Sequence, residues 1–340
     1  MSNQDHLQAT IADLVQLGRG ILAADESAPT IAKRFKAINL ESTEENRRAY
    51  RALLLTAPGL GEYISGAILF EETLGHATDD GTLLPAAAWG QKIVPGIKVD
   101  KGPIALALSP GDMVTQGLDG LALRLQIYRN QGARFAKWRE VYSISQHLPS
   151  AQGIAASAEM LARYAAACQG EGLVPIVEPE ILMDGDHSIE RCAEVSEAVL
   201  HAVFHALHRH HVVLEHMLLK PAMVLPGKEQ QSKASPQAVA DATIKILRRT
   251  VPAAVPSINF LSGGQAPEEA TANLNALNQC DAALPWRLSI SYGRALQQPV
   301  LHAWNGKPAN IGAAQQALLK RARLNSLAMR GDYAPEMEND

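Results

Sequence analysis

The sequence has few cysteines, no long apolar run and no strong charge of either sign. Its three cysteines, Cys168, Cys192 and Cys280, are widely spaced and form no CxxC pair. This pattern excludes a disulfide framework and indicates a reducing compartment. No apolar run is long enough to span a bilayer, and Met1–His6 lacks the apolar core of a signal peptide. We therefore expect a cytoplasmic protein with no membrane partner.

The 340 residues include 31 basic and 35 acidic side chains, a formal net charge of −4. This near balance gives no sign of a protein that binds nucleic acid or another polyanion, so local basic groups would have to hold an anionic ligand. The hydrophobic share of 47% and the charged share of 19% are typical of globular proteins. A chain of this length forms one large α/β domain or two smaller ones.

A lysine at the end of an apolar run is the most informative residue in the chain. Lys220 follows the run Val212–Leu219, which reads as a buried strand, and precedes Pro221. Desolvation at such a place disfavours the ammonium form, and a neutral amine can attack a carbonyl and form a Schiff base. The alternative is a lysine that extends its head group to the surface from a strand end.

Two other apolar runs contain charged side chains. Lys137 and Arg139 stand two residues apart in one run, and Glu178 and Glu180 stand two apart in the next. Each pair shares one face of a strand, and buried charges are costly unless they are paired or functional. A second cation near Lys220 would promote its neutral form, and a carboxylate there could move protons. The set predicts amine catalysis.

Strand-like and helix-like segments alternate along the whole chain. The strand-like runs are 20–25, 63–70, 93–100, 135–144, 173–182, 212–219, 257–264 and 286–293, and the clearest helical patterns are 157–169, 189–210, 235–250 and 268–276. Alternation predicts a parallel sheet with right-handed crossovers. Eight such units predict an α/β fold, a (β/α)8 TIM barrel that forms a single domain over residues 1–340; a doubly wound sheet is the alternative. We expect the polar residues 330–340 to form a short, loose tail.

In such a barrel the catalytic groups lie at the carboxyl ends of the strands. Asp25 ends the first strand and Lys98 lies near the end of the third. Together with the charged pairs of the fourth and fifth strands, they predict one mouth that collects cations and carboxylates.

Glycine-containing turns follow the last two strands. Ser262, Gly263 and Gly264 close the seventh strand, and Gly293 and Arg294 close the eighth. Barrels often hold phosphate at this place through backbone N–H groups, and arginine adds charge-assisted bonds. A pair of ordinary turns is the alternative, but the position favours phosphate.

Hydroxyl and basic side chains follow the first strand. Ser27, Thr30, Lys33 and Arg34 stand where this strand leads into a helix, and they could hold a second phosphate. Ser27 or Thr30 could instead cap the helix, and for Ser27 both roles are compatible.

Three histidines, His201, His205 and His208, share one face of a predicted helix. Metal binding there is conceivable, but no acidic or cysteine ligand lies near in sequence. A solvated histidine face is the simpler interpretation, and we expect no metal site.

Eight segments resemble those of class I fructose-bisphosphate aldolase, the Schiff-base type. They are GILAADES (20–27), IAKR (31–34), PGIKVDKG (95–102), FAKWREVYSI (135–144), PIVEPEIL (175–182), LLKP (218–221), FLSGGQ (260–265) and SYGRALQ (291–297). They follow the order of the family over nearly the whole chain. The resemblance implies a (β/α)8 barrel and a glycolytic and gluconeogenic lyase. It implies reversible cleavage of fructose 1,6-bisphosphate to dihydroxyacetone phosphate and glyceraldehyde 3-phosphate, without metal or cofactor. It also implies a homo-oligomer, commonly a tetramer.

The resemblance assigns a role to each candidate residue. It implies that Lys220 forms the Schiff base, Glu178 is the general acid and base, Lys137 supports Lys220, Asp25 takes the proton of the C4 hydroxyl, and Glu180 and Arg139 assist. It implies that Ser262, Gly263, Gly293 and Arg294 bind the C1 phosphate, and that Ser27, Thr30 and Lys98 bind the C6 phosphate.

The chain departs from the family pattern at four places. They are Ala28-Pro29 after Ser27, Glu71 where animal enzymes have histidine, Ala222 in place of asparagine, and an ending without the family's terminal tyrosine. In the family that tyrosine is tied to proton transfer on the enamine and to substrate preference. Tyr333 is a candidate substitute. We expect the tail, with acidic Glu338 and Asp340, to lie outside the site because a phosphorylated substrate would repel it.

Two alternatives stay open. One is a Schiff-base barrel aldolase for another sugar phosphate, and the other is a non-catalytic scaffold on the same fold. Basic and glycine-rich features at both ends of the site argue against the first, and the complete acid, base and amine set argues against the second. The preference between fructose 1,6-bisphosphate and fructose 1-phosphate stays open.

Overall fold

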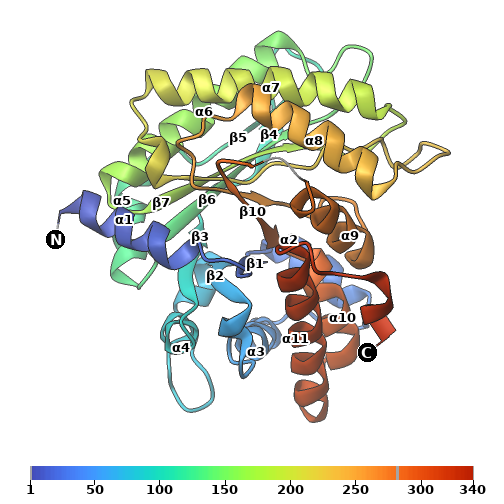
Figure 1. The fold of residues 1–340 in the computed structure, drawn as a ribbon. Coiled ribbons are helices and arrows are strands. Elements are labelled where there is room, and N and C mark those ends of the chain that lie inside the picture. The colour runs from blue at the N-terminus through green and yellow to red at the C-terminus, as the bar shows by residue number, and fades with distance from the viewer. Residues whose placement is uncertain (1, 281–282, 340) are drawn as a thin grey trace.

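The computed structural model describes residues 2–280 and 283–339. Within them, eight parallel strands form a closed barrel in the order β1-β10-β9-β8-β7-β6-β3-β2 (Figure 1). The barrel strands are β1 (Gly20–Ala24), β2 (Ile64–Leu69), β3 (Val94–Lys98), β6 (Phe135–Tyr142), β7 (Val174–Ile181), β8 (Leu218–Leu219), β9 (Ser257–Phe260) and β10 (Arg287–Tyr292). The predicted (β/α)8 barrel is confirmed.

The barrel strands are apolar because both of their faces are covered. Every residue of β2 is buried. Inside the barrel, Ile21, Ile68, Phe135 and Ile176 pack in one cluster, which also contains Leu14 from α1 (Asn3–Leu14). This apolar packing fills the interior and leaves the polar groups at the carboxyl ends of the strands.

Helices surround the strands (Figure 1). They are α2 (Ala28–Lys36), α3 (Glu44–Leu55), α4 (Leu84–Gly90), α5 (Leu121–Asn130), α6 (Ala151–Gly170), α7 (Ile189–Arg209), α8 (Pro236–Thr250), α9 (Pro267–Asn278), α10 (Arg294–Trp304) and α11 (Ile311–Ala328). Short 3-10 helices are η1 (Leu60–Glu62), η2 (Glu71–Leu74), η3 (Leu214–His216), η4 (Pro308–Asn310) and η5 (Pro335–Asn339). Side chains of Ser150, Ser188 and Ser235 accept backbone N–H groups at the starts of α6, α7 and α8, which stabilises these ends. Within the described residues, none of the helices is long and apolar enough to cross a membrane.

The sixth predicted strand is much shorter than expected. Only Leu218 and Leu219 form β8, while Leu214–His216 fold as the 3-10 helix η3 and Val213 is 45% exposed. The predicted strand was therefore wrong for residues 212–217 and confirmed for Leu218 and Leu219. An apolar run does not show which of its residues find a partner strand. β8 pairs only with Ile176 and Val177 of β7 and with Ile258 of β9.

An antiparallel hairpin outside the barrel was not predicted. It consists of β4 (Pro103–Ala105) and β5 (Met113–Thr115). The fully buried Glu140 of β6 accepts hydrogen bonds from Trp138 Nε1 at 2.8 Å and from the Thr115 N–H at 3.0 Å. Burial raises the pKa of Glu140 to about 7. This carboxyl group therefore joins β5 to β6 and can titrate near neutral pH.

The C-terminal segment is not the loose tail that its polarity indicates. Tyr333 is 6% exposed and Met337 packs against the core. Glu338 pairs with the buried Arg321 of α11 at 2.6 Å, because a buried guanidinium needs a counter-charge. The Tyr333 hydroxyl donates to Glu338 at 3.0 Å, so the ring is held beside α9 and α11. Asp340, the end of the predicted tail, lies outside the described residues.

Candidate active site

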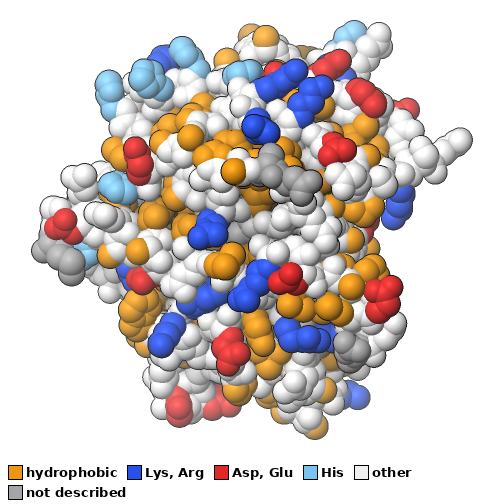
Figure 2. Space-filling model, viewed as in Figure 1, with side chains coloured by type: hydrophobic (Ala, Val, Ile, Leu, Met, Phe, Trp, Pro, Cys, Tyr) orange, Lys and Arg blue, Asp and Glu red, His pale blue; other side chains and the backbone are white. Residues whose placement is uncertain are grey.

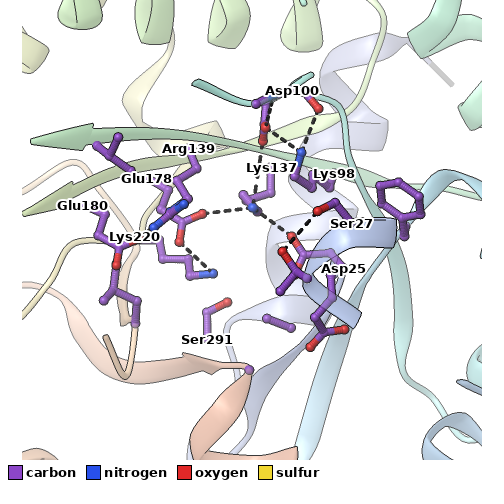
Figure 3. Close-up of a pocket in the computed structure, with 18 of the residues that line it drawn as sticks. Asp25, Ser27, Lys98, Asp100, Lys137, Arg139, Glu178, Glu180, Lys220 and Ser291 are labelled. Carbon is purple, nitrogen blue, oxygen red and sulfur yellow. Dashed lines mark hydrogen bonds and ion pairs between the residues drawn. The ribbon is translucent and has the colours of Figure 1, made fainter. Parts of the chain in front are cut away.

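A cavity of about 630 Å³ opens at the carboxyl ends of the barrel strands. Every residue to which the family resemblance assigns a role lines it: Asp25, Ser27, Thr30, Lys98, Lys137, Arg139, Glu178, Glu180, Lys220, Ser262, Gly263, Gly293 and Arg294. Figure 3 shows Asp25, Lys98, Lys137, Glu178 and Lys220, which come from strand ends far apart in sequence, converging on one place. The barrel therefore brings all of these residues together, whereas Lys33 is not among the described residues that line the cavity.

Lys220 lies directly after β8 and is only 4% exposed. Its N–H donates to the Val177 carbonyl at 2.8 Å, which continues the pairing with β7. Its Nζ lies 3.1 Å from Glu178 Oε1. The other oxygen of Glu178 lies 3.2 Å from Lys137 Nζ. One buried carboxylate thus bridges two amines (Figure 3).

Lys137 is the centre of a buried charge network. Its Nζ also lies 2.8 Å from Asp25 Oδ2 and 3.9 Å from Asp100 Oδ2. Burial alone would lower the pKa of Lys137, but the charges of Asp25, Glu178 and Asp100 outweigh it and hold this pKa above its ordinary range. Lys137 therefore stays an ammonium.

The pKa of Asp25 is shifted in the opposite direction from that of Lys137. Burial alone would raise the pKa of Asp25, but Lys137, Lys220 and Lys98 outweigh burial and hold this pKa well below its ordinary value. Asp25 therefore stays a carboxylate, the form that can accept a proton.

Arg139 and Glu180 form a second ion pair beside the first network. Burial opposes the charge of Arg139, but Glu180 outweighs it and raises the pKa of the guanidinium. Arg139 also stands opposite Glu178 in the register of β6 and β7. Side chains alternate between the two faces of a strand, so β6 presents Lys137 and Arg139 on one face and β7 presents Glu178 and Glu180 on one face. Both predicted pairs therefore lie at the mouth of the barrel.

Asp100 is a site residue that the sequence analysis did not single out. Its Oδ1 and main-chain oxygen bind Lys98 Nζ at 2.5 and 2.8 Å. Asp100 Oδ2 and Glu178 Oε2 are buried without a hydrogen-bond partner among the described residues. Both instead face Lys137 Nζ as ion-pair partners, at 3.9 and 3.2 Å. The sequence carries no clear signal for this role, because Asp100 follows the end of β3, where the alternation of a strand no longer applies.

The turn after β9 lies close to the start of α10. Gly263 has φ +53°, a left-handed conformation that favours glycine, whereas the φ of Gly293, −98°, lies outside that region. Arg294 Nη2 donates to the Gly263 carbonyl at 2.6 Å. Backbone N–H groups at the start of a helix attract anions, so this corner of the cavity is suited to a phosphate.

Ser27 and Thr30 form the other hydroxyl pair. Ser27 occupies the N-cap position of α2, but its side chain makes no capping bond. Its Oγ lies 3.1 Å from Thr30 Oγ1. Behind them, Glu26 binds Arg34 and the buried Arg51. Ser27 therefore stands at the N-cap position without capping the helix through its side chain, and its hydroxyl stays available to a ligand.

At the rim, Glu71 occupies one of the positions that depart from the family pattern. It accepts from Lys101 Nζ at 2.9 Å and from the Tyr128 hydroxyl at 2.7 Å. The bond from Tyr128 is the main reason that the pKa of Glu71 is lowered. Glu71 is thus a charged group at the rim of the cavity, and it binds both Lys101, which precedes β4, and Tyr128 of α5.

The three histidines of α7 lie far from this chemistry. His201, His205 and His208 are exposed, and histidine side chains gather along the top edge in Figure 2, where α7 runs in Figure 1. This agrees with the predicted solvated face.

The fold and the cavity define a barrel enzyme with buried amine, acid and base groups at its mouth. The family model for class I fructose-bisphosphate aldolase matches residues 6–340. Fructose-bisphosphate aldolase 3, chloroplastic, of Arabidopsis thaliana is 56% identical over 99% of this chain and 85% of its own. The cytosolic fructose-bisphosphate aldolase 4 of the same plant is 56% identical over 93% of this chain and 80% of its own.

A solved structure supports the same relationship. The fructose-bisphosphate aldolase of Plasmodium falciparum, in a complex with TRAP and a small-molecule inhibitor, superposes with a TM-score of 0.96. It shares 51% identity and covers 98% of this chain and 96% of its own. The chain belongs to the class I fructose-bisphosphate aldolase family.

Proposed function

We propose that this protein reversibly cleaves fructose 1,6-bisphosphate to dihydroxyacetone phosphate and glyceraldehyde 3-phosphate through a Schiff base on Lys220. The observation that carries the proposal is the bridge from Lys220 through Glu178 to Lys137 and Asp25, inside a cavity that a sugar bisphosphate can enter. Family membership supports the same reaction. The whole chain, 1–340, acts as one barrel domain.

In the first half of the proposed reaction, Lys220 Nζ attacks the C2 carbonyl of the open-chain sugar. Glu178, at 3.1 Å, first takes one proton from the Lys220 ammonium, which frees the attacking amine. After the attack a second N–H proton passes to the carbinolamine oxygen, and Glu178 returns the first proton as this hydroxyl leaves as water. The product is a protonated imine. Lys137, held as an ammonium, keeps Glu178 oriented between the two amines.

In the second half, the C3–C4 bond breaks and its electron pair moves to the imine, forming an enamine. Asp25 accepts the proton of the C4 hydroxyl as glyceraldehyde 3-phosphate leaves. Protonation of the enamine at C3 and hydrolysis of the imine then release dihydroxyacetone phosphate and the Lys220 amine. Arg139 and Glu180 hold the neighbouring strand ends in place.

Two groups of residues bind the phosphates in this proposal. Ser262, Gly263, Gly293 and Arg294 take the C1 phosphate at the start of α10, and Ser27, Thr30 and Lys98 take the C6 phosphate. Holding both ends places C2 beside Lys220 in a fixed geometry. Lys98 is paired with Asp100. A bound phosphate would therefore either share Lys98 with the Asp100 carboxylate or take the place of that carboxylate.

Borohydride reduction in the presence of dihydroxyacetone phosphate, followed by peptide mapping, tests the nucleophile. We expect a covalent label on Lys220 and no label in Lys220→Met, which keeps much of the volume but cannot form an imine. Lys137→Met serves as the matched lysine control and should still be labelled at Lys220. A label on Lys137 would overturn the assignment.

We also propose that the protein is a cytoplasmic homotetramer. Leu123 and Ile127, one turn apart on α5, are 67% and 55% exposed, and a contact with another copy would cover them. The thiols Cys168, Cys192 and Cys280 are free, as in a reducing compartment. Light scattering tests the assembly: Leu123→Lys with Ile127→Lys should lower the mass, and an unchanged mass would reject this face. A fluorescent fusion tests the location.

A further inference from the structure

A buried arginine on α11 joins the C-terminal segment to α9. Arg321 is 3% exposed, and its Nη1 donates to both carboxylate oxygens of Glu338 at 2.6 Å. Its Nη2 donates to the Pro267 carbonyl at 3.0 Å and to the Thr271 hydroxyl at 2.5 Å. A buried charge without a partner is costly. Glu338 therefore neutralises the guanidinium that holds the first turn of α9.

The segment around Glu338 is seated for this contact. Met337 packs against the core, and the Tyr333 hydroxyl donates to Glu338 Oε1 at 3.0 Å. The Tyr333 N–H donates to Asn275 Oδ1, also at 3.0 Å. Figure 1 shows the C-terminal segment beside α10 and α11, close to α9. The Glu338 carboxylate is thus held in place by the packing of its neighbour Met337 and by the hydrogen bond from Tyr333.

The same helix, α9, holds the turn that lines the cavity. Gln265 is 2% exposed, and both its backbone N–H and its Nε2 donate to the Ser262 carbonyl at 3.1 Å. Asn273 of α9 donates from Nδ2 to Gln265 Oε1 at 2.8 Å. A shift of the first turn of α9 would therefore move Ser262 and Gly263.

We propose that Glu338 is a positioning residue for the phosphate turn Ser262–Gly264. It neutralises Arg321, Arg321 holds the first turn of α9, and α9 holds the turn through Asn273 and Gln265. The inference rests on the proposed function, in which this turn binds the C1 phosphate. Glu338 itself touches neither the substrate nor the cavity.

The test compares Glu338→Gln with Glu336→Gln, an exposed glutamate of the same segment. Both variants lose one negative charge, but only the first weakens the contact with Arg321. We expect Glu338→Gln to raise the KM for fructose 1,6-bisphosphate and the inhibition constant of dihydroxyacetone phosphate by about fivefold each. Its kcat should stay within about twofold. Equal KM values in the two variants, or a fall in kcat at unchanged KM, would overturn the proposal.

Thr271→Val keeps the inference testable if Glu338→Gln does not fold. It removes one of the two contacts from Arg321 to α9 and should raise KM in the same direction; an unchanged KM would count against the inference. Arg294→Ala separates this idea from the function on which it rests. If Arg294→Ala raises KM and Glu338→Gln does not, only the positioning role fails. If Arg294→Ala leaves KM unchanged, the phosphate assignment itself fails.

Discussion

Replacing Lys137 by methionine should destabilise the protein in a way that depends on pH. The methionine keeps much of the volume but leaves Asp25, Glu178 and Asp100 without the ammonium that lies 2.8, 3.2 and 3.9 Å from them. Breaking a buried pair by removing one partner costs roughly 3–5 kcal/mol. We expect the free energy of unfolding to fall by about that amount at about pH 8.

The matched control is Lys101→Met. Lys101 pairs with Glu71 at 2.9 Å, a similar distance, but both side chains are 49% exposed. Exposed pairs contribute roughly 0.2–1 kcal/mol. The two lysines have nearest carboxylates at similar distances, so the contrast between them reports the burial of Lys137 together with the number of carboxylates around it.

The pH dependence follows from Asp25. In the wild-type protein the pKa of Asp25 is depressed, so the pair contributes stability above the ordinary aspartate pKa and loses it as pH falls through the folded value. Without Lys137, we expect burial, the largest single influence on this pKa, to outweigh the remaining charges of Lys220 and Lys98 and to raise the pKa of Asp25. The native variant then takes up a proton as pH falls from neutral and recovers stability. The deficit relative to wild type should be largest at about pH 8 and shrink towards about pH 4.

Urea unfolding followed by circular dichroism at several pH values measures the deficit. A deficit that stays constant from about pH 8 to about pH 4 would show that lost packing, not charge, is responsible. A deficit no larger than that of Lys101→Met would show that the buried network contributes little to stability.

Three further predictions concern phosphate, metal and the hairpin. Arg294→Ala should weaken binding of fructose 1,6-bisphosphate by roughly 1.5–3 kcal/mol, the contribution of a charge-assisted hydrogen bond, and weaken binding of a sugar without the C1 phosphate less. Equal losses in titration calorimetry would make Arg294 structural. EDTA should leave cleavage intact because the imine serves as the electron sink that a Lewis acid would otherwise supply. Loss of activity with recovery on adding zinc would contradict the Schiff-base assignment. Because the pKa of Glu140 is raised to about 7, the native state holds its proton between the ordinary glutamate pKa and about 7. Wild type should therefore lose up to roughly 3 kcal/mol of stability relative to Glu140→Gln as pH rises through this range; parallel stability profiles would refute this.

The candidate site could be predicted almost completely because its residues interrupt apolar strands. Lys137, Arg139, Glu178 and Glu180 stand out in runs that are otherwise largely apolar. Asp100 does not stand out in this way, because it follows the strand and resembles an ordinary polar loop residue. Its role depends on the distance to Lys137, which only the closed barrel determines.

The tail shows where prediction from local polarity fails. Glu338 looks like a solvated acidic residue, but it pairs with Arg321, which looks like an exposed helix position. Each polar side chain is buried only because the other is present. Such pairing over 17 positions of the chain carries no local signal.

What the sequence by itself determined is the barrel and the chemistry at its mouth. Alternating strands and helices, with charged residues at strand ends, leave few ways to bury the apolar faces, and parallel strands bring their carboxyl ends together. Only the tertiary structure decided that β8 has two paired residues, that a hairpin is joined to β6 through Glu140, and that the last residues are anchored on α11. The physical reason is that these features depend on which groups meet across long separations. The pairing partner, the burial and the pKa shift of a residue depend on the groups around it in the folded protein and not on the residue alone.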